Sequence, residues 1–584
     1  MTTYWLDFTT GGGTDDGGDG SQGNPFKSPY AARTAMATVS NVFMGKGRYI
    51  RLNTGAAGRV IQPPAGGTPK NPMIFHGYDP ANPFEWWCGS MLRTTAAGGP
   101  TWTADGGDVH HCSLGFNLGA GEAYGGRLLW YYDPATPAIS PRQLYWMPDA
   151  VGGAQAGCVA TVDSFWFNTT GNVLYVHLRP GESPNGKIIV PDGVSGVASY
   201  GDRWDTATNS GNGLFAGRKN IVFSNFSYLY CGSRPWSYQV ASYPNGHDCE
   251  RVELRRGWFG FTGRDDRGVI MPIARSGPII IDECRLQCGS LGIIYSWGGQ
   301  VGTHVSDEAM SAPGHVAVGL RATRNHLLDA GYTHRGQGDG HAVGAQASAS
   351  DWIIAGNLCD QTVRPIVMWP RDVGQSYPWT VLNRIKIRGN NIINTVDSGY
   401  LHPAMRMISW ENGDWLASLP NYDQSNGEVK GNVIRGPISR ITATYYNGTL
   451  ANPTGGNKQD SPCGIRTART AVANVIATWG NEISGMSWGL VDEQTDGGIA
   501  AIDYRWNKIR ALTQHVGTSV LFNSVIAVGG MASDGGGNTG KTGTTWDRQK
   551  YDAAVSDGYG RTGRRKILTD WRTDTNYDVN SVAV

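Results

Sequence analysis

The chain has 584 residues, of which 83 are glycine and 21 are tryptophan, and only 17% are charged. The absence of a Gly-X-Y period excludes a collagen, and a hydrophobic content of 40% excludes a disordered chain. The 49 Lys and Arg balance the 48 Asp and Glu, and the short basic run "GRTGRRK" at 560–566 is too small to indicate a nucleic acid partner. Many glycines together with many aromatic residues predict an all-β chain with frequent tight turns.

The first residues, "MTTYWLDFTTGGG", show neither a basic start nor an apolar run of the signal-peptide type. No window along the chain reaches the length of a membrane span. We therefore expect a protein that is made in a cytosol, does not insert into a membrane, and leaves the cell by lysis or by a leaderless route if it acts outside.

Four regions follow one another along the chain. Residues 1–80 contain the first strand signals, and residues 81–215 alternate short strand signals with Gly/Pro turns, as in "GGRLLWYYDPATP" at 125–137. Residues 216–530 carry an internal repeat, and residues 531–584 have weak periodicity. We expect a cap with first coils, an elaborated β-rich insertion, a main solenoid and a loop-rich end, respectively.

The repeat of residues 216–530 consists of a short apolar or β-branched run, an X-Asn or Gly-Asn pair, one or two apolar residues and a turn. Examples are "DWIIAGNLCDQT" (351–362), "RIKIRGNNIINT" (384–395) and "GEVKGNVIRG" (427–436). The asparagines of the repeat lie at Asn225, Asn325, Asn357, Asn391, Asn432, Asn481, Asn507 and Asn523. Gaps mostly between about 25 and 50 residues are typical of a solenoid.

Asparagine suits the bends of such a solenoid for two reasons. It tolerates the left-handed backbone conformation, and its amide can bond to its counterpart one coil away. Neighbouring coils stack by strand pairing at about 4.8 Å. The flanking apolar residues then point inward, and the variable spacing between units indicates loops on one side of the stack.

Nine cysteines are scattered along the chain, without the paired spacing of a structural zinc site. Cys284 and Cys288 are predicted near opposite ends of one short strand. The interpretation is buried free thiols in a protein that folds in a reducing cytosol.

The repeated "GN-x-I" units resemble those of right-handed parallel β-helix repeat proteins. The opening "GGDGSQGNPFKSPYAARTAM" (17–36) is similar to the start of carbohydrate-active chains of that kind, where such a segment precedes a capping helix. "SFWFNTTGNVLYVHLRPGESPNG" (164–186) resembles a β-hairpin insertion of the same group. The resemblance implies an all-β fold, a single-stranded right-handed parallel β-helix with an elaborated N-terminal region and loop insertions. It does not specify an activity, because this fold hosts lyases, hydrolases, epimerases and fibres.

Within this fold, "HRGQGDGHAVGAQAS" (334–348) is the densest bend. In one interpretation it is a structural corner in which Asp339 caps backbone N–H groups and His341 starts a strand. In the other, Asp339 is a general acid or base and His341 orients it or acts as the base. His334 is a substrate-binding candidate, and His334 or Asp329 could complete a cation site. No ligand spacing is diagnostic of a metal.

Glycoside hydrolysis needs two carboxylates, and adjacent strand residues point to opposite faces, so the pair is expected to join different coils. Asp265 and Asp266, in a Gly-bounded loop, are the candidates for one or two coils from Asp339. Downstream loops combine tryptophan with charge, and we expect a glycan groove there if they project on the same side as the 334–341 turn. Its residues are Trp369, Arg371, Trp410 and Trp415, with Glu411 as a further catalytic candidate.

The resemblance is to phage tailspikes and polysaccharide depolymerases. It implies a homotrimer that binds and cleaves a bacterial surface polysaccharide, such as a capsule, exopolysaccharide or O-antigen, with a glycoside hydrolase favoured over a lyase. The protein would be located in the virion tail, attached to the tail or to an adaptor protein, and would need no cofactor. Two alternatives remain open: a lyase or epimerase for uronic-acid glycans, for which a calcium ion could be required, and a fibre that only adheres.

Overall fold

The structure is a computed structural model. It describes residues 1–9, 18–29, 31–38, 40–52, 66–94, 99–114, 129–136, 141–146, 154–168, 170–190, 219–229, 236–237, 250–260, 268–271, 278–287, 292–297, 317–328, 341–346, 349–360, 362, 364–368, 380–393, 406–411, 422–423, 426–436, 463–468, 476–484, 488–493, 502–509, 524–528, 545–547, 550–551, 559–561, 564–566 and 582–583.

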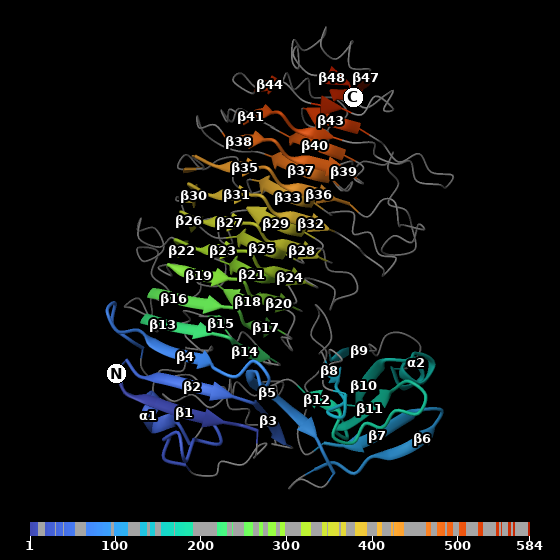
Figure 1. Ribbon diagram of the computed structural model, residues 1–584. Coiled ribbons are helices and arrows are strands. Elements are labelled where there is room, and N and C mark those ends of the chain that lie inside the picture. Colours follow the sequence, from blue (N-terminus) through green and yellow to red (C-terminus); the bar gives the residue numbers. More distant parts are fainter. Residues whose placement is uncertain are drawn as a thin grey trace.

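Parallel strands stack along the long axis of the molecule from the N-terminal to the C-terminal end (Figure 1). The first long sheet (sheet 1) has 13 described strands, paired in parallel. They are β1 (Thr3–Asp7), β2 (Val42–Lys46), β4 (Met73–Gly77), β13 (Lys219–Ser224), β16 (Glu250–Arg255), β19 (Ile279–Asp282), β23 (Arg321–Thr323), β27 (Ile353–Ala355), β31 (Lys386–Arg388), β35 (Glu428–Lys430), β38 (Ile476–Trp479), β41 (Ile502–Arg505) and β44 (Thr545–Asp547).

The second sheet (sheet 2) runs beside the first, because each of its strands except the last one, β48, follows a sheet 1 strand in the chain. Its strands are β3 (Arg48–Leu52), β5 (Phe84–Leu92), β14 (Phe226–Leu229), β17 (Trp258–Gly260), β20 (Arg285–Gln287), β24 (His326–Leu328), β28 (Leu358–Asp360), β32 (Asn391–Ile393), β36 (Val433–Arg435), β39 (Glu482–Ser484), β42 (Lys508–Ile509), β45 (Lys550–Tyr551) and β48 (Val582–Ala583).

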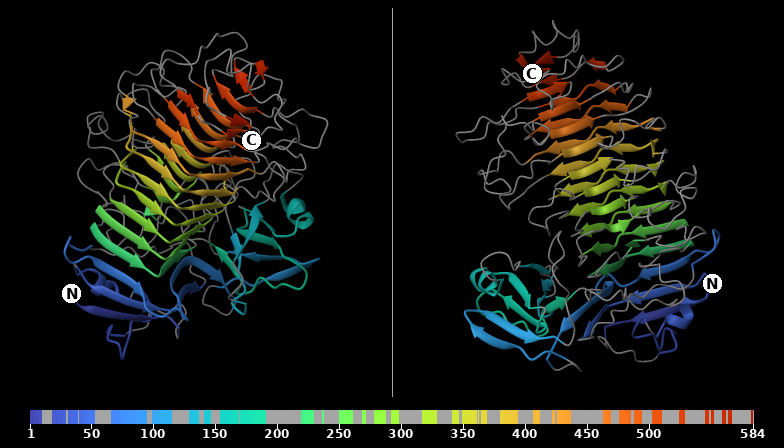
Figure 2. Two further views of the ribbon diagram at one scale, coloured as in Figure 1. Left: turned by 45° about the horizontal axis from the view of Figure 1, so that its top comes forward. Right: turned by 180° about the vertical axis from the view of Figure 1, so that it is seen from behind.

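Two further sheets close the coils. Sheet 3 contains β15 (Trp236–Ser237), β18 (Gly268–Met271), β21 (Gly292–Trp297), β25 (His341–Gln346), β29 (Arg364–Met368), β33 (Arg406–Glu411), β37 (Cys463–Ala468), β40 (Trp488–Glu493), β43 (Ser524–Val528), β46 (Tyr559–Arg561) and β47 (Arg564–Lys566). Sheet 4 contains β22 (Ala317–Val318), β26 (Ala349–Ser350), β30 (Thr380–Asn383) and β34 (Tyr422–Asp423). Coils of this kind confirm the predicted parallel β-helix (Figure 2).

The core of the helix is built from matching side chains in successive coils. At the N-terminal end of sheet 1, Phe43, Phe75 and Phe223 stack with ring centroids 4.8 and 5.0 Å apart. Aliphatic residues continue the same row, among them Leu254 and Ile281, both fully buried. The short helix α1 (Arg33–Met36) covers this end, since Ala32 and Met36 are buried in the same core.

Asparagines form a ladder at the corner between sheets 1 and 2. The ladder residues are Asn325, Asn357, Asn390, Asn432, Asn481 and Asn507, all buried. The Oδ1 atom of each of the last five accepts hydrogen bonds from the backbone N and the side-chain Nδ2 of the ladder asparagine one coil before it. The side-chain amides therefore bond from coil to coil, as predicted.

Two details of the predicted ladder are wrong. Asn390 rather than Asn391 is the ladder residue, and Asn225 bonds to the carbonyl of Gly77 instead of to another asparagine. The left-handed residue is the one before the ladder position, such as Arg324 (φ 55°) or Gly431 (φ 62°). Asn225 (φ 48°) occupies that preceding position, whereas Asn523 lies outside the described residues.

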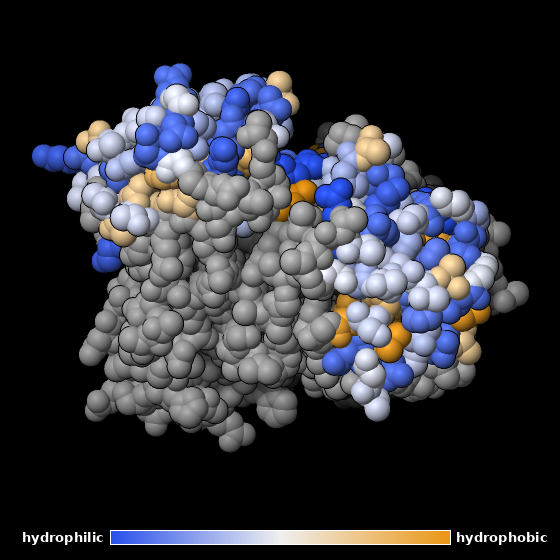
Figure 3. Space-filling view, turned by 90° about the horizontal axis from the view of Figure 1, so that it is seen from below, coloured by the Kyte–Doolittle hydropathy of each residue, from blue (hydrophilic) through white to orange (hydrophobic). Residues whose placement is uncertain are grey.

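An insertion interrupts the helix between β5 and β13, although β4 pairs directly with β13. It contains β6 (Thr103–Gly106), β7 (Val109–Ser113), β8 (Leu129–Tyr131), β9 (Arg142–Trp146), α2 (Ala154–Ala160), β10 (Ser164–Asn168), β11 (Val173–His177) and β12 (Ile188–Val190). The predicted hairpin is confirmed, since β10 and β11 pair antiparallel. The insertion lies beside the N-terminal coils, and in Figure 3 its described surface mixes hydrophilic residues with small hydrophobic patches.

Candidate functional site

The outward face of sheet 2 carries polar and aromatic side chains in register. Phe259, Leu286 and Leu327 are fully buried in the core. Because strand residues alternate between faces, their neighbours Trp258, Arg285 and His326 point away from the core. Trp258 pairs with Arg285, and Arg285 pairs with His326, so the three side chains form one row across three coils.

Arg285 lies between an aromatic ring and an amide in this row. Its guanidinium carbon is 4.7 Å from the centroid of the Trp258 ring. Its Nε donates a hydrogen bond to Oε1 of Gln287 over 3.0 Å, and Gln287 is itself buried. The contact with the ring is a cation–π interaction, which holds the guanidinium flat without neutralising it.

The row continues with a histidine and an aspartate. Nε2 of His326 lies 3.9 Å from Oδ2 of Asp360, which is too far for a hydrogen bond. Burial and the positive charge of Arg285 lower the pKa of His326, while the Asp360 carboxylate opposes this shift. The imidazole is therefore neutral at pH 7 and able to accept a proton.

The row begins where the insertion joins the helix. Trp258 packs against a buried cluster that links the two parts, formed by Trp87, Met91, Trp130, Tyr132, Ile189 and Leu229. Arg48 lies over the Trp87 ring at 4.2 Å, with its Nε 2.5 Å from Glu85 Oε2 and with a hydrogen bond to the Tyr132 hydroxyl. Unlike Arg285, Arg48 is neutralised, so its role is to fix the insertion to the helix.

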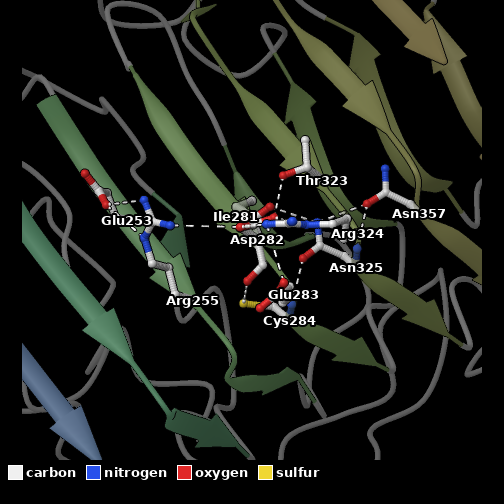
Figure 4. Close-up of polar contacts among 10 residues, drawn as sticks. All are labelled: Glu253, Arg255, Ile281, Asp282, Glu283, Cys284, Thr323, Arg324, Asn325 and Asn357. Atoms are coloured by element: carbon white, nitrogen blue, oxygen red, sulfur yellow. Dashed lines mark hydrogen bonds and ion pairs between the residues drawn. The ribbon is translucent and has the colours of Figure 1, made fainter. Parts of the chain in front are cut away.

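A second polar cluster lies on the outward face of sheet 1 (Figure 4). Arg324 donates hydrogen bonds from Nε and Nη2 to the two oxygens of the Asp282 carboxylate. The same carboxylate also accepts a 2.7 Å hydrogen bond from Thr323 Oγ1. Arg255 donates to Glu253 over 2.9 Å and lies 3.9 Å from Asp282. Burial raises the pKa of Asp282, but the hydrogen bonds from Arg324 and Thr323 outweigh it and the net shift is downward.

The chemistry of the sheet 1 cluster is structural rather than catalytic. Glu253 and Asp282 lie on neighbouring coils, as a pair of catalytic carboxylates would, but each is matched by an arginine. Asp282, whose pKa is lowered, does not hold the proton that a general acid must donate. The cluster therefore ties successive coils together.

Three predicted catalytic residues and the predicted substrate-binding residue His334 belong to segments that follow sheet 2 strands in the chain. Asp265, Asp266, His334 and Asp339 all lie outside the described residues. Residues 261–267 connect β17 to β18, and residues 329–340 connect β24 to β25, so both segments leave sheet 2 for sheet 3. Asp265 and Asp266 thus belong to the segment after the strand of Trp258, and His334 and Asp339 belong to the segment after the strand of His326.

The tryptophan-rich loops are attached elsewhere. Trp369, Arg371 and Trp415 lie outside the described residues, but their segments follow the last residues of the sheet 3 strands β29 and β33. The 329–340 segment precedes the first residue of a sheet 3 strand. A strand of five residues spans about 16 Å. The 329–340 segment is therefore attached at the first residue of a sheet 3 strand, whereas the tryptophan-rich loops are attached at the last residues of such strands.

Three candidates lie on described strands. His341 has no exposed surface and pairs with Gly292 and Arg364, so the interpretation as a base that reaches a glycan does not fit, whereas an orienting role stays a prediction. Trp410 is 1% exposed, and a Cβ added to Gly427 would lie 2.6 Å from its Cη2. Trp410 is therefore a core residue with no ring face for a sugar. Glu411 ends β33, and its side chain is not described.

The described residues give no sign of a metal or membrane site. No group of three His, Cys, Asp or Glu side chains in this part of the chain is arranged to hold a metal ion. No helix among the same residues is long and apolar enough to cross a bilayer. Cys112, Cys158, Cys284 and Cys359 are buried free thiols, as predicted, and burial raises the pKa of Cys284 and of Cys359 to about 12.

The sheet 2 row was not predicted from the sequence. Trp258, Arg285 and His326 belong to three different repeat units, and their spacings of 27 and 41 residues carry no motif. Only the register of the strands brings them together. The signal that could have found them is the polar residue directly before the buried apolar residue of each unit.

No family model matches the chain, and no curated protein matches it. Among solved structures it is distantly similar to a glycoside hydrolase, with 10% identity over 88% of this chain and 94% of the other, at a TM-score of 0.39. It is also similar to XylC in complex with xylose, with 10% identity over 96% and 86% of the chains and a TM-score of 0.45. A lacto-N-biosidase of family GH136 from Eubacterium ramulus gives 9% identity over 100% and 67%, with a TM-score of 0.32. Similarity at this level assigns neither a family nor an activity.

Proposed function

We propose that the protein binds a bacterial surface polysaccharide along the outward face of sheet 2 and depolymerises it, as part of a phage tailspike or tail fibre. The observation that carries this proposal is the row of Trp258, Arg285 and His326, which joins an aromatic ring to polar groups across three coils. A sugar ring can lie against the edge of an aromatic side chain and bond through its hydroxyl groups to the neighbouring polar side chains. A linear row along a solenoid also matches the repeating shape of a polysaccharide chain.

The proposed hydrolysis places Asp339 and one of Asp265 and Asp266 in the two carboxylate roles, in the segments that join β24 to β25 and β17 to β18. Chain connectivity supports this assignment, because both segments join sheet 2 to sheet 3. The proposed cytosolic synthesis is supported by four buried free thiols, because a reducing cytosol keeps such thiols unpaired. A homotrimer in a virion tail completes the proposal and is checked by sedimentation of the purified protein.

The test is to incubate the purified protein with capsule or lipopolysaccharide of candidate hosts and to mass-analyse the products. We expect oligosaccharides of one repeating length from the wild type and none from Asp339→Asn. Asp351→Asn is the matched control, because this carboxylate pairs with Arg384 far from the sheet 2 row. Cleavage that persists in Asp339→Asn would show that the site assignment is wrong, and intact glycan with retained binding would establish a purely adhesive fibre.

A lyase is the second candidate function, and one observation favours it. Elimination from a uronate needs a base and a cation that neutralises the carboxylate. The neutral His326 next to Arg285 offers both in adjacent coils. Products with unsaturated ends, seen as rising ultraviolet absorbance, would favour this lyase over the hydrolase.

A further inference from the structure

The charge of Arg285 is the feature of the sheet 2 row that its own surroundings leave unexplained. Its described contacts are the Trp258 ring and the Gln287 amide, and neither carries a negative charge. The nearest titratable residue in the row of Arg285 is His326, which is neutral. The next one is Asp360, which lies beside His326 one coil further on. Among the residues that the structure describes, this guanidinium is thus held in place but not neutralised.

Three other arginines that face outward on the same two sheets are neutralised. Arg48 pairs with Glu85, Arg324 with Asp282, and Arg388 with Glu428. In those cases the partner carboxylate lies in the neighbouring coil: directly across the strands for Arg48, one position away for Arg324, and two positions away on the same face for Arg388. At the positions across from Arg285 the chain has Trp258 and His326 instead.

The geometry of Arg285 suits a planar anion. The Trp258 ring covers one face of the guanidinium, and Nε is occupied by Gln287, so the Nη atoms at its edge keep donors for a ligand. A guanidinium fixed in this way loses little rotamer freedom on binding and forms two parallel hydrogen bonds with a carboxylate. A neutral sugar hydroxyl needs only one such donor and no charge.

We propose that Arg285 receives the carboxylate of an acidic sugar, so that the glycan bound along sheet 2 is a carboxylate-bearing polysaccharide. This inference rests on the proposed function and names the substrate class of the same site. Trp258 then has two tasks: it orients the guanidinium, and its indole edge borders the adjoining sugar.

The test compares each of a set of polysaccharides in its native form with the same polymer after chemical reduction of its carboxyl groups. The probes are hyaluronan, alginate, polygalacturonate and the capsule of the host under study, with dextran as a neutral member. We expect binding to at least one acidic polymer, weakened at least tenfold by carboxyl reduction and by Arg285→Gln. Arg285→Lys keeps the positive charge but loses the paired donors of the guanidinium. Its affinity should therefore fall between that of the wild type and that of Arg285→Gln.

Arg388→Gln is the matched control, since it removes an outward guanidinium that Glu428 already neutralises. It should leave binding within twofold of the wild type. Binding that survives carboxyl reduction, or that Arg285→Gln leaves unchanged, would overturn the acidic-sugar inference while the proposed function stands. No binding to any polymer of the set would overturn both. Melting curves of the three variants show whether a loss of binding comes from a loss of fold.

Discussion

At the scale of single residues, the asparagine ladder stabilises the corner between sheets 1 and 2. Asn390 is 1% exposed, and its Oδ1 accepts from the backbone N of Asn357 at 3.0 Å and from the Nδ2 of Asn357 at 2.9 Å. Its own Nδ2 donates to the carbonyl of Ile354 and to Oδ1 of Asn432. A buried side chain that satisfies four groups in two neighbouring coils is costly to remove.

We therefore expect Asn390→Ala to lower the free energy of unfolding by about 3 kcal/mol, because buried donors of Asn357 lose their acceptor. Asn391→Ala is the matched control: it is the same substitution one position along, on the outward face of sheet 2. Urea unfolding of the two variants measures the difference. Equal destabilisation by both would contradict the ladder as the reason for the buried asparagine.

How far the ladder could be predicted depends on the same residues. Spacing alone identified Asn325, Asn357, Asn432, Asn481 and Asn507 as repeat positions, and all five belong to the ladder. In "RGNN" two asparagines are adjacent, and a pattern cannot decide between them. The structure decides because Gly389 takes the left-handed conformation (φ 58°) and the residue after it turns inward. The sequence pattern likewise could not show that Asn225 itself takes the left-handed position before the ladder residue.

At the scale of elements, ion pairs between neighbouring strands contribute to stability in a pH-dependent way. The hydrogen bonds and charges around Asp282 hold its folded-state pKa below its ordinary value, which burial alone would have raised. A group of this kind stabilises the fold above its unfolded pKa of about 3.9, and the contribution is lost as the pH falls through the folded value. The effect is modest because Arg324 is 62% exposed and screened by solvent.

We expect Asp282→Asn to destabilise the protein by about 1 kcal/mol at pH 7, with the difference from the wild type shrinking below about pH 4. Thermal unfolding of both proteins between pH 7 and pH 2 measures this. Glu283→Gln serves as the control, because this neighbouring carboxylate is 47% exposed and lies 3.5 Å from the same arginine. A gap between Asp282→Asn and the wild type that widens with acid would refute the proposed ion pair.

The elements also explain why the candidate site was harder to predict than the fold. Alternating apolar residues mark each strand, but whether Trp410 faces the core or a glycan depends on a shift of one residue, and it faces the core. His341 is buried for the same reason, at the start of a strand that pairs on both sides. Trp258 and Arg285 face outward, and only parallel pairing of β17 with β20 brings them into contact.

At the scale of the whole molecule, the stack of coils provides a rigid, elongated support, and the insertion is fixed to its N-terminal part by Arg48 and the cluster around Trp87 (Figures 1 and 2). Stability in such a stack is roughly a sum over coils and their interfaces. The candidate glycan face starts at the insertion and continues along sheet 2, whereas sheet 1 carries neutralised ion pairs. The two faces therefore differ in what they can bind, although both expose charged and aromatic residues.

Hydroxyl-radical footprinting with and without a bound surface polysaccharide tests this difference most directly, because tryptophan and histidine side chains are readily modified. We predict that the glycan protects Trp258 and His326 on sheet 2 and leaves the modification of Trp506 unchanged. Trp506 is 46% exposed, lies at the corner after β41 near the C-terminal end of the stack, and packs edge-on against Trp479 of sheet 1, so it is a sensitive reference away from the Trp258 row. Protection of Trp506 without protection of Trp258 and His326 would contradict the assignment of sheet 2 as the glycan-binding face.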